Sequence, residues 1–575
     1  MTAETNPTPA VLALEIGSVH TRAVLFEVVE DRYHFIGAGV VNSSFNEPDF
    51  DAGLAAFKAI LRLQEITGRV LINRSGELVL ASQSDGDGVD HLVITTSCGP
   101  SLKVVTCGLL NDISLESARN LAGTVYGKVV ESISINDRRL IHTQLDAVVA
   151  ARPDLLIFAG GVDNGANRSL MRTSELIVSA LRLLPRIQRP RILVCGNSSL
   201  SQKLSETFDH YTAVKTAENI RPSINEENLN PAMRALNELV MDIQNESIGG
   251  LKQVSALAST PPRLSNQAFY QVIRFLGQQY DPAKGVLGLD VGGSYSSAVY
   301  ADRKQARLQT FNYGLGSGLE ALLETSPIQE IAGWLTDETT EDEVRNYLWQ
   351  RSLFPSSISS TPAELAIELA AARQILRLMI RELLTRGVVP HNRFEPILLS
   401  GTGLNRTATA FQSLRVVLDG IQPMGVCPLI LDKHGILPIL GAAAEVSPIL
   451  AVQVLESSAF TNLATVVNVV SHARRGVPVI SVRLRDSKGN TADAEVRQGA
   501  ILALPLEPGA TGELEIRQLK PVVIDSEDTP GIPIKVHGGV CGVVFDARGR
   551  PLKLPRDLTK RREMLLDWQY MLGGD

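Results

Sequence analysis

Two stretches decide the fold: Leu12-Ala-Leu-Glu-Ile-Gly-Ser-Val-His-Thr-Arg-Ala-Val-Leu-Phe26 and Leu287-Gly-Leu-Asp-Val-Gly-Gly-Ser-Tyr-Ser-Ser-Ala-Val-Tyr-Ala301. The two stretches align at a spacing of 275 residues, and five of their fifteen positions are identical. Both have an acid at the same position, Glu15 in the first and Asp290 in the second. Each stretch is an apolar run, an acid, a glycine turn with hydroxyl side chains, and a second apolar run. This pattern is typical of a β-hairpin with a tight turn. Its repetition predicts a duplicated fold.

A second pattern also recurs. Leu155-Leu-Ile-Phe-Ala-Gly-Gly161 and Ile397-Leu-Leu-Ser-Gly-Thr-Gly403 are each an apolar run that ends in glycines and precedes a helical pattern. We interpret the two as the same element of each lobe. The sequence therefore predicts two related α/β lobes, the first over residues 11–275 with insertions and the second over residues 285–455.

The pattern changes near residue 460. Ile480, Val482 and Leu484 alternate with polar residues, and glycine and proline recur throughout the segment. Alternation with a period of two predicts a β-sandwich or barrel over residues 460–555, followed by a helix over residues 556–575. Two roles remain open for this β-domain. It folds separately and recruits a protein partner, or it caps the second lobe and shields apolar surface.

Composition narrows the function classes. The chain has 575 residues, of which 44% are apolar and 20% charged, as in ordinary globular proteins. A net charge of −7 disfavours nucleic acid as a partner. The five cysteines lie far apart without a C-x-x-C pair, which argues against a disulfide framework and a zinc site. With neither a signal peptide nor a convincing membrane span in the sequence, we expect a cytoplasmic protein.

The hairpin turns carry the strongest chemical signal. Backbone amides in a glycine turn form a concavity that binds phosphate oxygens, and a neighbouring acid can hold Mg²⁺. We expect Glu15 and Asp290 to direct the metal and to orient the attacking water, which makes them the candidate catalytic and metal-binding residues. The candidate nucleotide-binding residues are Gly17, Ser18, Thr21, Gly292, Gly293, Ser294, Gly401, Thr402 and Gly403. The last three would let backbone lie flat against a nucleoside.

The order of these blocks resembles the actin, sugar-kinase and heat-shock chaperone superfamily of ATPases. Leu14–Leu25 and Leu289–Val299 are similar to its two phosphate motifs, and Ile397–Leu404 is similar to its adenosine motif. Gly435–Ala444 looks like its second connecting helix. Within the superfamily, Ser97–Gly123 and Arg152–Gly161 most resemble the MutL accessory proteins of glutamate mutase.

The resemblance implies ATP or ADP with Mg²⁺ in a cleft between two actin-like lobes, and a cobalamin-dependent mutase as protein partner. Glu15 stands where the superfamily usually has Asp, and Arg22 stands near a position that is often Lys. We therefore expect slow ATP turnover at most.

Two alternatives remain. A small-molecule kinase on the same fold would need a general base, for which Asp163 is the best candidate. An actin-like scaffolding protein would assemble with copies of itself, so a homo-oligomer also stays open.

Two further motifs carry weaker signals. Asp432-Lys-His434-Gly matches only the start of a cobalamin-binding pattern, because Leu437 stands where its final glycine should be. We expect an ordinary loop histidine there and no cobalamin on this chain. Gly314-Leu-Gly-Ser-Gly318 lacks the spacing of a dinucleotide-binding motif. It is equally compatible with a loop beside a nucleotide and with an ordinary turn.

Overall fold

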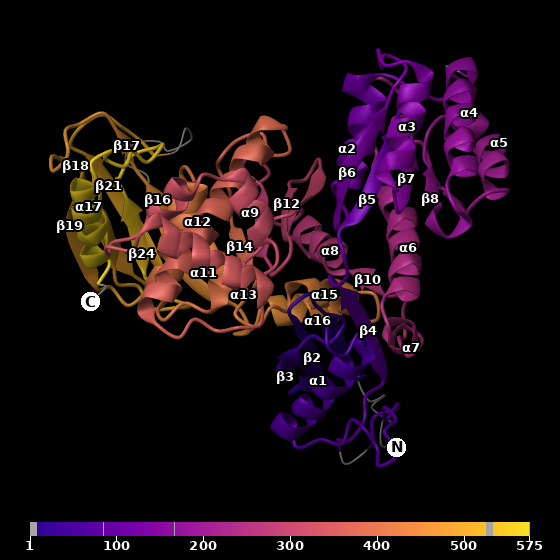
Figure 1. Cartoon of the computed structure of the whole chain (residues 1–575). Helices are drawn as coiled ribbons and strands as arrows, with labels where there is room; N and C mark the ends of the chain where they lie inside the picture. The colour runs from indigo at the N-terminus through magenta and orange to yellow at the C-terminus, as the bar shows by residue number, and fades with distance from the viewer. Residues whose placement is uncertain (1–8, 84–85, 166, 525–532, 574–575) are drawn as a thin grey trace. The chain divides into compact units, whose positions relative to one another are not determined.

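The computed structural model describes residues 9–83, 86–165, 167–524 and 533–573, and its chain divides into two units (Figure 1). The first unit holds Met1–Phe26 and Ile36–Ala268, and the second holds Glu27–Phe35 and Phe269–Asp575. Among the described residues, none of the helices combines the length and apolar character that crossing a membrane requires.

The first unit begins with a sheet in the strand order β10-β4-β1-β2-β3. Strand β1 pairs antiparallel with β2 and parallel with β4. Every residue of β1 is buried, which explains its continuous apolar run. The elements of this part are β1 Val11–Ile16, β2 His20–Val29, β3 Arg32–Asn42, β4 His91–Thr96, β10 Arg263–Leu264, α1 Ala52–Thr67 and α7 Leu251–Ser255.

The second unit begins its sheet in the same way, in the order β13-β12-β11-β14-β15. Strand β11 pairs antiparallel with β12 and parallel with β14. The strands are β11 Val286–Val291, β12 Ser296–Ala301, β13 Ala306–Phe311, β14 Ile397–Ser400 and β15 Val426–Leu431. The helices are α8 Ser265–Gly277, α9 Leu319–Thr325, α10 Ile328–Ala332, α11 Glu341–Leu353, α12 Pro362–Thr385, α13 Thr402–Asn405, α14 Ala410–Ile421, α15 Leu437–Ala443 and α16 Pro448–Leu455.

The two opening hairpins share one register. Val11 pairs with Phe26 in the first hairpin and Val286 pairs with Ala301 in the second, so both strands keep the 275-residue spacing of the sequence repeat. In each turn, the backbone amide of the first glycine, Gly17 or Gly292, donates a hydrogen bond of 3.0 Å to the carbonyl three residues further along the chain. The prediction of two duplicated actin-like lobes is confirmed.

A parallel sheet is inserted into the first unit, in the order β6-β5-β7-β8-β9 (Figure 1). Its strands are β5 Leu102–Cys107, β6 Gly127–Ile133, β7 Leu155–Phe158, β8 Arg191–Val194 and β9 Val214–Thr216. The intervening helices are η1 Asn111–Leu115, α2 Glu116–Ala122, α3 Ile141–Ala151, α4 Asn167–Leu183, η2 Arg186–Gln188, α5 Ser198–Asp209 and α6 Asn230–Ser247.

This inserted sheet corrects one interpretation. The apolar run of β7 was expected to be the first lobe's counterpart of β14, but β7 pairs with β5 and β8 in the inserted sheet. The counterpart of β14 is β4, which pairs with β1 as β14 pairs with β11. An apolar strand that runs into glycines occurs in any parallel α/β sheet, so the pattern alone did not distinguish the two.

The region after residue 460 is rich in strands, as predicted, but its described strands divide among three sheets. Strand β16 pairs with β15, and β24 and β20 then extend the second unit's sheet to eight strands. A separate sheet has the order β19-β18-β21-β23, and β17 pairs with β22. The bounds are β16 Thr461–Asn468, β17 Val470–Ser471, β18 Pro478–Asp486, β19 Thr491–Arg497, β20 Ile501–Leu504, β21 Thr511–Gln518, β22 Val522–Val523, β23 Ile534–His537, β24 Val543–Asp546 and α17 Leu558–Met571. Of the two roles left open, this continuity favours capping of the second lobe.

A buried ionic cluster joins this C-terminal region to the helices of the second unit. Asp419 on α14 accepts hydrogen bonds from Arg373 of α12 at 3.0 Å and from Arg548, which follows β24, at 2.6 Å. Arg548 also pairs with Asp546 at 2.9 Å, and its guanidinium lies 4.8 Å from the ring of Trp568 on α17. Asp419, Asp546 and Arg548 have fully buried side chains.

The charges in this cluster depend on one another. Burial raises the pKa of Asp419, but the positive charges of Arg548 and Arg373 outweigh burial and hold that pKa below its usual value. A lowered pKa in the folded state means that the carboxylate stabilises the fold at neutral pH, and that this contribution is lost as the pH falls below about 4.

Asp419→Asn should therefore lower the free energy of unfolding by about 3–5 kcal/mol, because it leaves Arg373 and Arg548 buried without their shared counter-charge. The matched control is Asp493→Asn, whose 2.8 Å pair with Arg483 is exposed and should contribute at most about 1 kcal/mol. Urea denaturation of the full chain measures both. Equal midpoints for the two variants would contradict the role of the cluster.

Candidate functional site

The turn of the first hairpin is built on Gly17. A side chain there would place Cβ 2.5 Å from the carbonyl oxygen of His20, so the turn requires glycine. The hydroxyl of Thr21 is buried and lies 2.9 Å from that of Ser43, which in turn donates to the Gly17 carbonyl at 2.7 Å. Thr21 therefore supports the turn through Ser43, which binds the Gly17 carbonyl. Ser18 is half-buried, and its amide forms no hydrogen bond with another described residue.

Glu15 is buried and forms an ion pair with Arg22, its cross-strand partner in the register. Thr95 on β4 lies on the other side of Glu15 in the register, and its buried hydroxyl has no hydrogen-bond partner in the described structure. The negative charge of Glu15 is thus already balanced by an arginine. A cation would have to compete with Arg22 for this carboxylate.

In the second hairpin, the acid at the equivalent position has a different cross-strand partner. Asp290 is half-buried, and its cross-strand partner is the uncharged Ser297. The amides of Gly293 and Ser294 form no hydrogen bond with any described residue, which leaves adjacent donors in the turn. Neighbouring unpaired amides beside an acid are the arrangement that binds phosphate together with a divalent cation.

The loop Gly314–Gly318 packs directly on this turn. The amides of Leu315 and Gly316 donate to the carbonyls of Gly292 and Gly293, at 2.9 and 2.8 Å, and the hydroxyls of Ser317 and Ser294 lie 2.6 Å apart. A Cβ on Gly314 would collide with the Gly293 carbonyl. The sequence did not separate this arrangement from an ordinary turn. The signal was three glycines at alternate positions, the spacing that close backbone contact requires.

The turn between β14 and α13 packs against the end of β11 and against the loop Gly314–Gly318. Gly401 has φ of 104°, and a Cβ there would collide with the Val291 carbonyl at the end of β11. A Cβ on Gly403 would overlap the Leu315 side chain. In the second unit, the structure thus brings together Gly292–Ser294, Gly314–Gly318 and Gly401–Gly403.

Asp432 connects the end of β14 to the start of α15 by hydrogen bonds. Its buried carboxylate accepts from the hydroxyl of Ser400 at 3.0 Å and from the amides of Ile436 and Leu437 at 3.0 and 2.8 Å. Ser400 in turn lies beside Asp290 in the register of β11 and β14. No group of three or more His, Cys, Asp or Glu side chains with metal-binding geometry occurs among the described residues. Any metal here would need oxygen ligands from a bound phosphate as well.

A sequence profile of the MutL protein family matches residues 11–459. The chain belongs to the MutL family. The resemblance noted from the sequence is therefore confirmed. No curated protein matches the chain.

Solved structures that align with this MutL family member share little sequence with it. Nucleotide-free acetone carboxylase is 11% identical, with 85% of this chain and 81% of that chain covered and a TM-score of 0.34. Xylulose kinase from Bifidobacterium adolescentis is 11% identical, with 78% and 93% covered and a TM-score of 0.28. A glycerol dehydratase reactivase is 10% identical, with 76% and 100% covered and a TM-score of 0.31.

Asp163, the candidate base for a kinase, fastens a loop in this MutL protein. Its carboxylate accepts from the amide of Ser198 and the side chain of Asn219, each at 3.0 Å. Burial raises its pKa, but these hydrogen bonds outweigh burial and hold the pKa below the usual value. A carboxylate with a lowered pKa is a poor general base near neutral pH. The position therefore fits helix capping better than catalysis.

His434 contacts Phe35 within the second unit, with ring centroids 4.5 Å apart and the ring planes tilted by 31°. Burial lowers its pKa. The five cysteines are buried free thiols, and burial raises the pKa of Cys98 to about 11.

Gly401→Ala should destabilise the second unit strongly, because the new Cβ meets backbone and φ lies in the left-handed region. The matched control is Gly387→Ala at the end of α12, where φ is 65° but nothing lies within 4 Å of the added Cβ. Thermal unfolding of the two variants compares collision plus strain with strain alone. We expect the control to cost about 1 kcal/mol and Gly401→Ala to cost clearly more. Equal losses would show that the close approach to Val291 is unimportant.

Proposed function

We propose that this MutL protein is an ATP-binding accessory protein that assists a cobalamin-dependent mutase by slow, Mg²⁺-dependent turnover. The observation that carries the proposal is the repeated hairpin. Both copies keep the same register, the same turn hydrogen bond and an acid two residues before the first glycine of the turn. Two such turns supply phosphate-binding amides in duplicate, as a polyphosphate would use them.

The residues of the second unit have the clearer roles. The amides of Gly293 and Ser294 would bind phosphate oxygens, and Asp290 would bind the cation directly or through water. Gly401, Thr402 and Gly403 would lie against the nucleoside. Mg²⁺, when bound, neutralises charge on the phosphates and polarises the bond to be broken.

In the first unit, Arg22 gives Glu15 a conditional role. While no anion is present, the ion pair holds both side chains. A phosphate near Gly17 and Ser18 would compete for Arg22, since guanidinium binds phosphate as well as carboxylate. Glu15 would then be free to orient water or a metal-bound water. Its availability depends on this exchange, which supports slow turnover rather than fast catalysis.

Accessory function fits these features better than small-molecule phosphorylation does. A kinase needs a base against a substrate hydroxyl, and Asp163 is committed to Ser198 and Asn219. Water as the acceptor needs no such pocket. Nucleotide binding alone can shift the populations of two conformations, provided that the nucleotide prefers one of them.

Mg-ATP should raise the thermal stability of the full chain, since a ligand at 100 times its Kd contributes about 2.7 kcal/mol. Asp290→Asn should weaken binding mainly in the presence of Mg²⁺, because it removes a carboxylate that the cation needs. Asp493→Asn, an exposed acid on β19, is the control and should bind like the wild type. Calorimetry with ATP and ADP, each with and without Mg²⁺, measures these effects. Absence of heat and of thermal shift at millimolar nucleotide would overturn nucleotide binding.

The partner is tested separately. A cobalamin-dependent mutase that has been inactivated by cofactor damage should regain activity when this protein, ATP and fresh cobalamin are added together. Omission of ATP, or use of the Asp290→Asn variant, should prevent recovery. Recovery without ATP, or none with every component present, contradicts the accessory role. Phosphate release that is strongly stimulated by one hydroxyl-bearing metabolite, with formation of its phosphate ester, would favour a kinase instead.

A further inference from the structure

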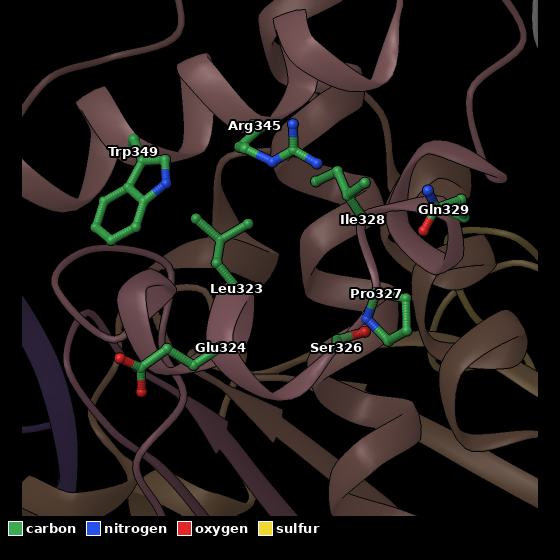
Figure 2. A pocket seen from close by; sticks show the side chains of 8 residues that line it. All are labelled: Leu323, Glu324, Ser326, Pro327, Ile328, Gln329, Arg345 and Trp349. Carbon is green, nitrogen blue, oxygen red and sulfur yellow. The ribbon is translucent and has the colours of Figure 1, made fainter.

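A surface pocket of about 350 Å³ lies in the second unit, between α9, α10 and α11 (Figure 2). Its polar side chains include Ser326, Gln329 and Arg345, and each of these forms a hydrogen bond with another residue of the second unit. The described part of the first unit, by contrast, has buried polar groups that lack such partners where β10 ends and α8 begins. A ligand would complete the hydrogen bonding there, whereas in the pocket it would have to displace existing partners.

Four side chains lie in one row across the sheet of the first unit. Arg263 of β10 pairs in register with Thr95 of β4, and Thr95 pairs with Glu15 of β1. Glu15 pairs in turn with Arg22 of β2. Register partners project from the same face of a sheet. Ile16, the next residue of β1, packs with α1 in the core, so the row lies on the face opposite α1.

The row and the start of α8 contain buried donors without a partner. Thr95 is 1% exposed, and its Oγ1 forms no hydrogen bond in the described structure. Ser265, which begins α8 two residues after Arg263, is 2% exposed, and its Oγ also has no partner. The same holds for Oδ1 of Asn266 and Nε2 of Gln267. Buried polar side chains are rarely left unpaired, and three of these four groups can donate to an anion.

Hydrogen bonds to neighbouring elements hold this part of the first unit in position. The amide of Leu264 donates to the side chain of Asn237 on α6 at 2.9 Å, and the amide of Asn266 donates to the hydroxyl of Tyr126 at 2.9 Å. The Asn266 side chain also donates to the carbonyl of Thr124 at 2.9 Å. The end of β10 and the first turn of α8 are therefore fixed without the two unpaired hydroxyls.

The row adjoins the turn of the first hairpin. Ser97, which follows β4, donates its amide to the carbonyl of Ile16 at 3.0 Å. A Cβ added to Gly17 would lie 3.8 Å from the hydroxyl oxygen of Ser97. Thr95 lies two residues before Ser97, as Glu15 lies two residues before Gly17. The end of β4 thus passes beside the turn to which the proposed function assigns phosphate binding.

The β10 end of the row carries positive charge. Arg263 is half-buried, and burial together with the positive charge of Arg234 on α6 lowers its pKa. An anion beside Arg263 would offset both effects, because it would supply hydrogen bonds and the opposite charge. At the other end of the row, Glu15 balances the charge of Arg22. A guanidinium group binds phosphate through paired N–H donors, and the further oxygens of a phosphate can accept from hydroxyls.

We propose that Arg263, with the hydroxyls of Thr95 and Ser265, binds the terminal phosphate of Mg-ATP. This assignment rests on the proposed function. Glu15, which would orient the attacking water, is the neighbour of Thr95 in the row, so a phosphate bound here is the one that water would attack. ADP lacks this phosphate. The three side chains would therefore make the protein prefer ATP to ADP.

Calorimetry of the full chain with Mg-ATP and with Mg-ADP tests this assignment. Thr95→Val removes a hydroxyl that has no described partner, so the free variant should unfold in urea at or above the wild-type midpoint. Its Kd for Mg-ATP should nevertheless rise by about fivefold, through the loss of one hydrogen bond, while its Kd for Mg-ADP stays unchanged. Arg263→Gln should raise the Kd for Mg-ATP by about tenfold or more, because it removes a charged donor. Arg62→Gln, at an exposed arginine of α1, is the matched control and should bind both nucleotides like the wild type.

The possible results separate this assignment from the proposed function. A wild type that binds neither nucleotide overturns both. A wild type that binds both nucleotides, with Thr95→Val and Arg263→Gln binding Mg-ATP equally well, overturns only the assignment. Equal losses for Mg-ATP and Mg-ADP also overturn it, because contacts to the terminal phosphate cannot affect ADP. Thr95→Val decides the question by itself if Arg263→Gln does not fold.

Discussion

Close approach of backbone segments around β11 is the constraint on which the candidate site depends. The loop Gly314–Gly318 donates hydrogen bonds to the turn after β11, and a Cβ at Gly314 or at Gly401, in the turn after β14, would collide with a carbonyl. Only glycine permits such contacts. The same packing leaves the amides of Gly293 and Ser294 without a described partner. The residues that the packing requires are thus the same ones to which the proposed function assigns phosphate binding.

The acid that is repeated in the two hairpins has a different cross-strand neighbour in each unit. In the first, Glu15 is held by Arg22, and in the second Asp290 lies across from a serine. Duplication preserved the strand register and the turn while the charge balance diverged. In the proposed function, this asymmetry would make Asp290 more available to a cation than Glu15, whose carboxylate is paired with Arg22.

The C-terminal region is continuous with the second unit in both its sheet and its core. Strand β16 adds to β15, and Arg548 links Asp419 of α14 to Asp546 of β24 inside the protein. Removing the chain after Glu456 would therefore expose the edge of β15 and leave Asp419 with one arginine fewer. A conformational change of this unit would carry the C-terminal strands and α17 with it.

The sequence predicted the features that depend on local pattern. The repeat predicted the strand register of each hairpin, because an apolar run on either side of a glycine turn allows few alternative strand pairings. It did not reveal that β7 belongs to an inserted sheet, since a buried strand followed by glycines reads alike in either sheet. The pairing of Glu15 with Arg22 depends on which residues face each other across the hairpin, and the packing of Gly314–Gly318 on the second turn depends on tertiary contact. The ionic cluster joins residues as distant as Asp419 and Arg548, and periodicity carries no information on such contacts.

Amide hydrogen exchange of the full chain can show whether the two hairpin turns bind nucleotide. The amides of Ser18 in the first hairpin and of Gly293 and Ser294 in the second should exchange quickly in the free protein, because they have no described partner. Saturating Mg-ATP should slow exchange in each hairpin turn, and should do so less in Asp290→Asn. Protection of neither turn, or protection confined to a region away from both, would contradict the account.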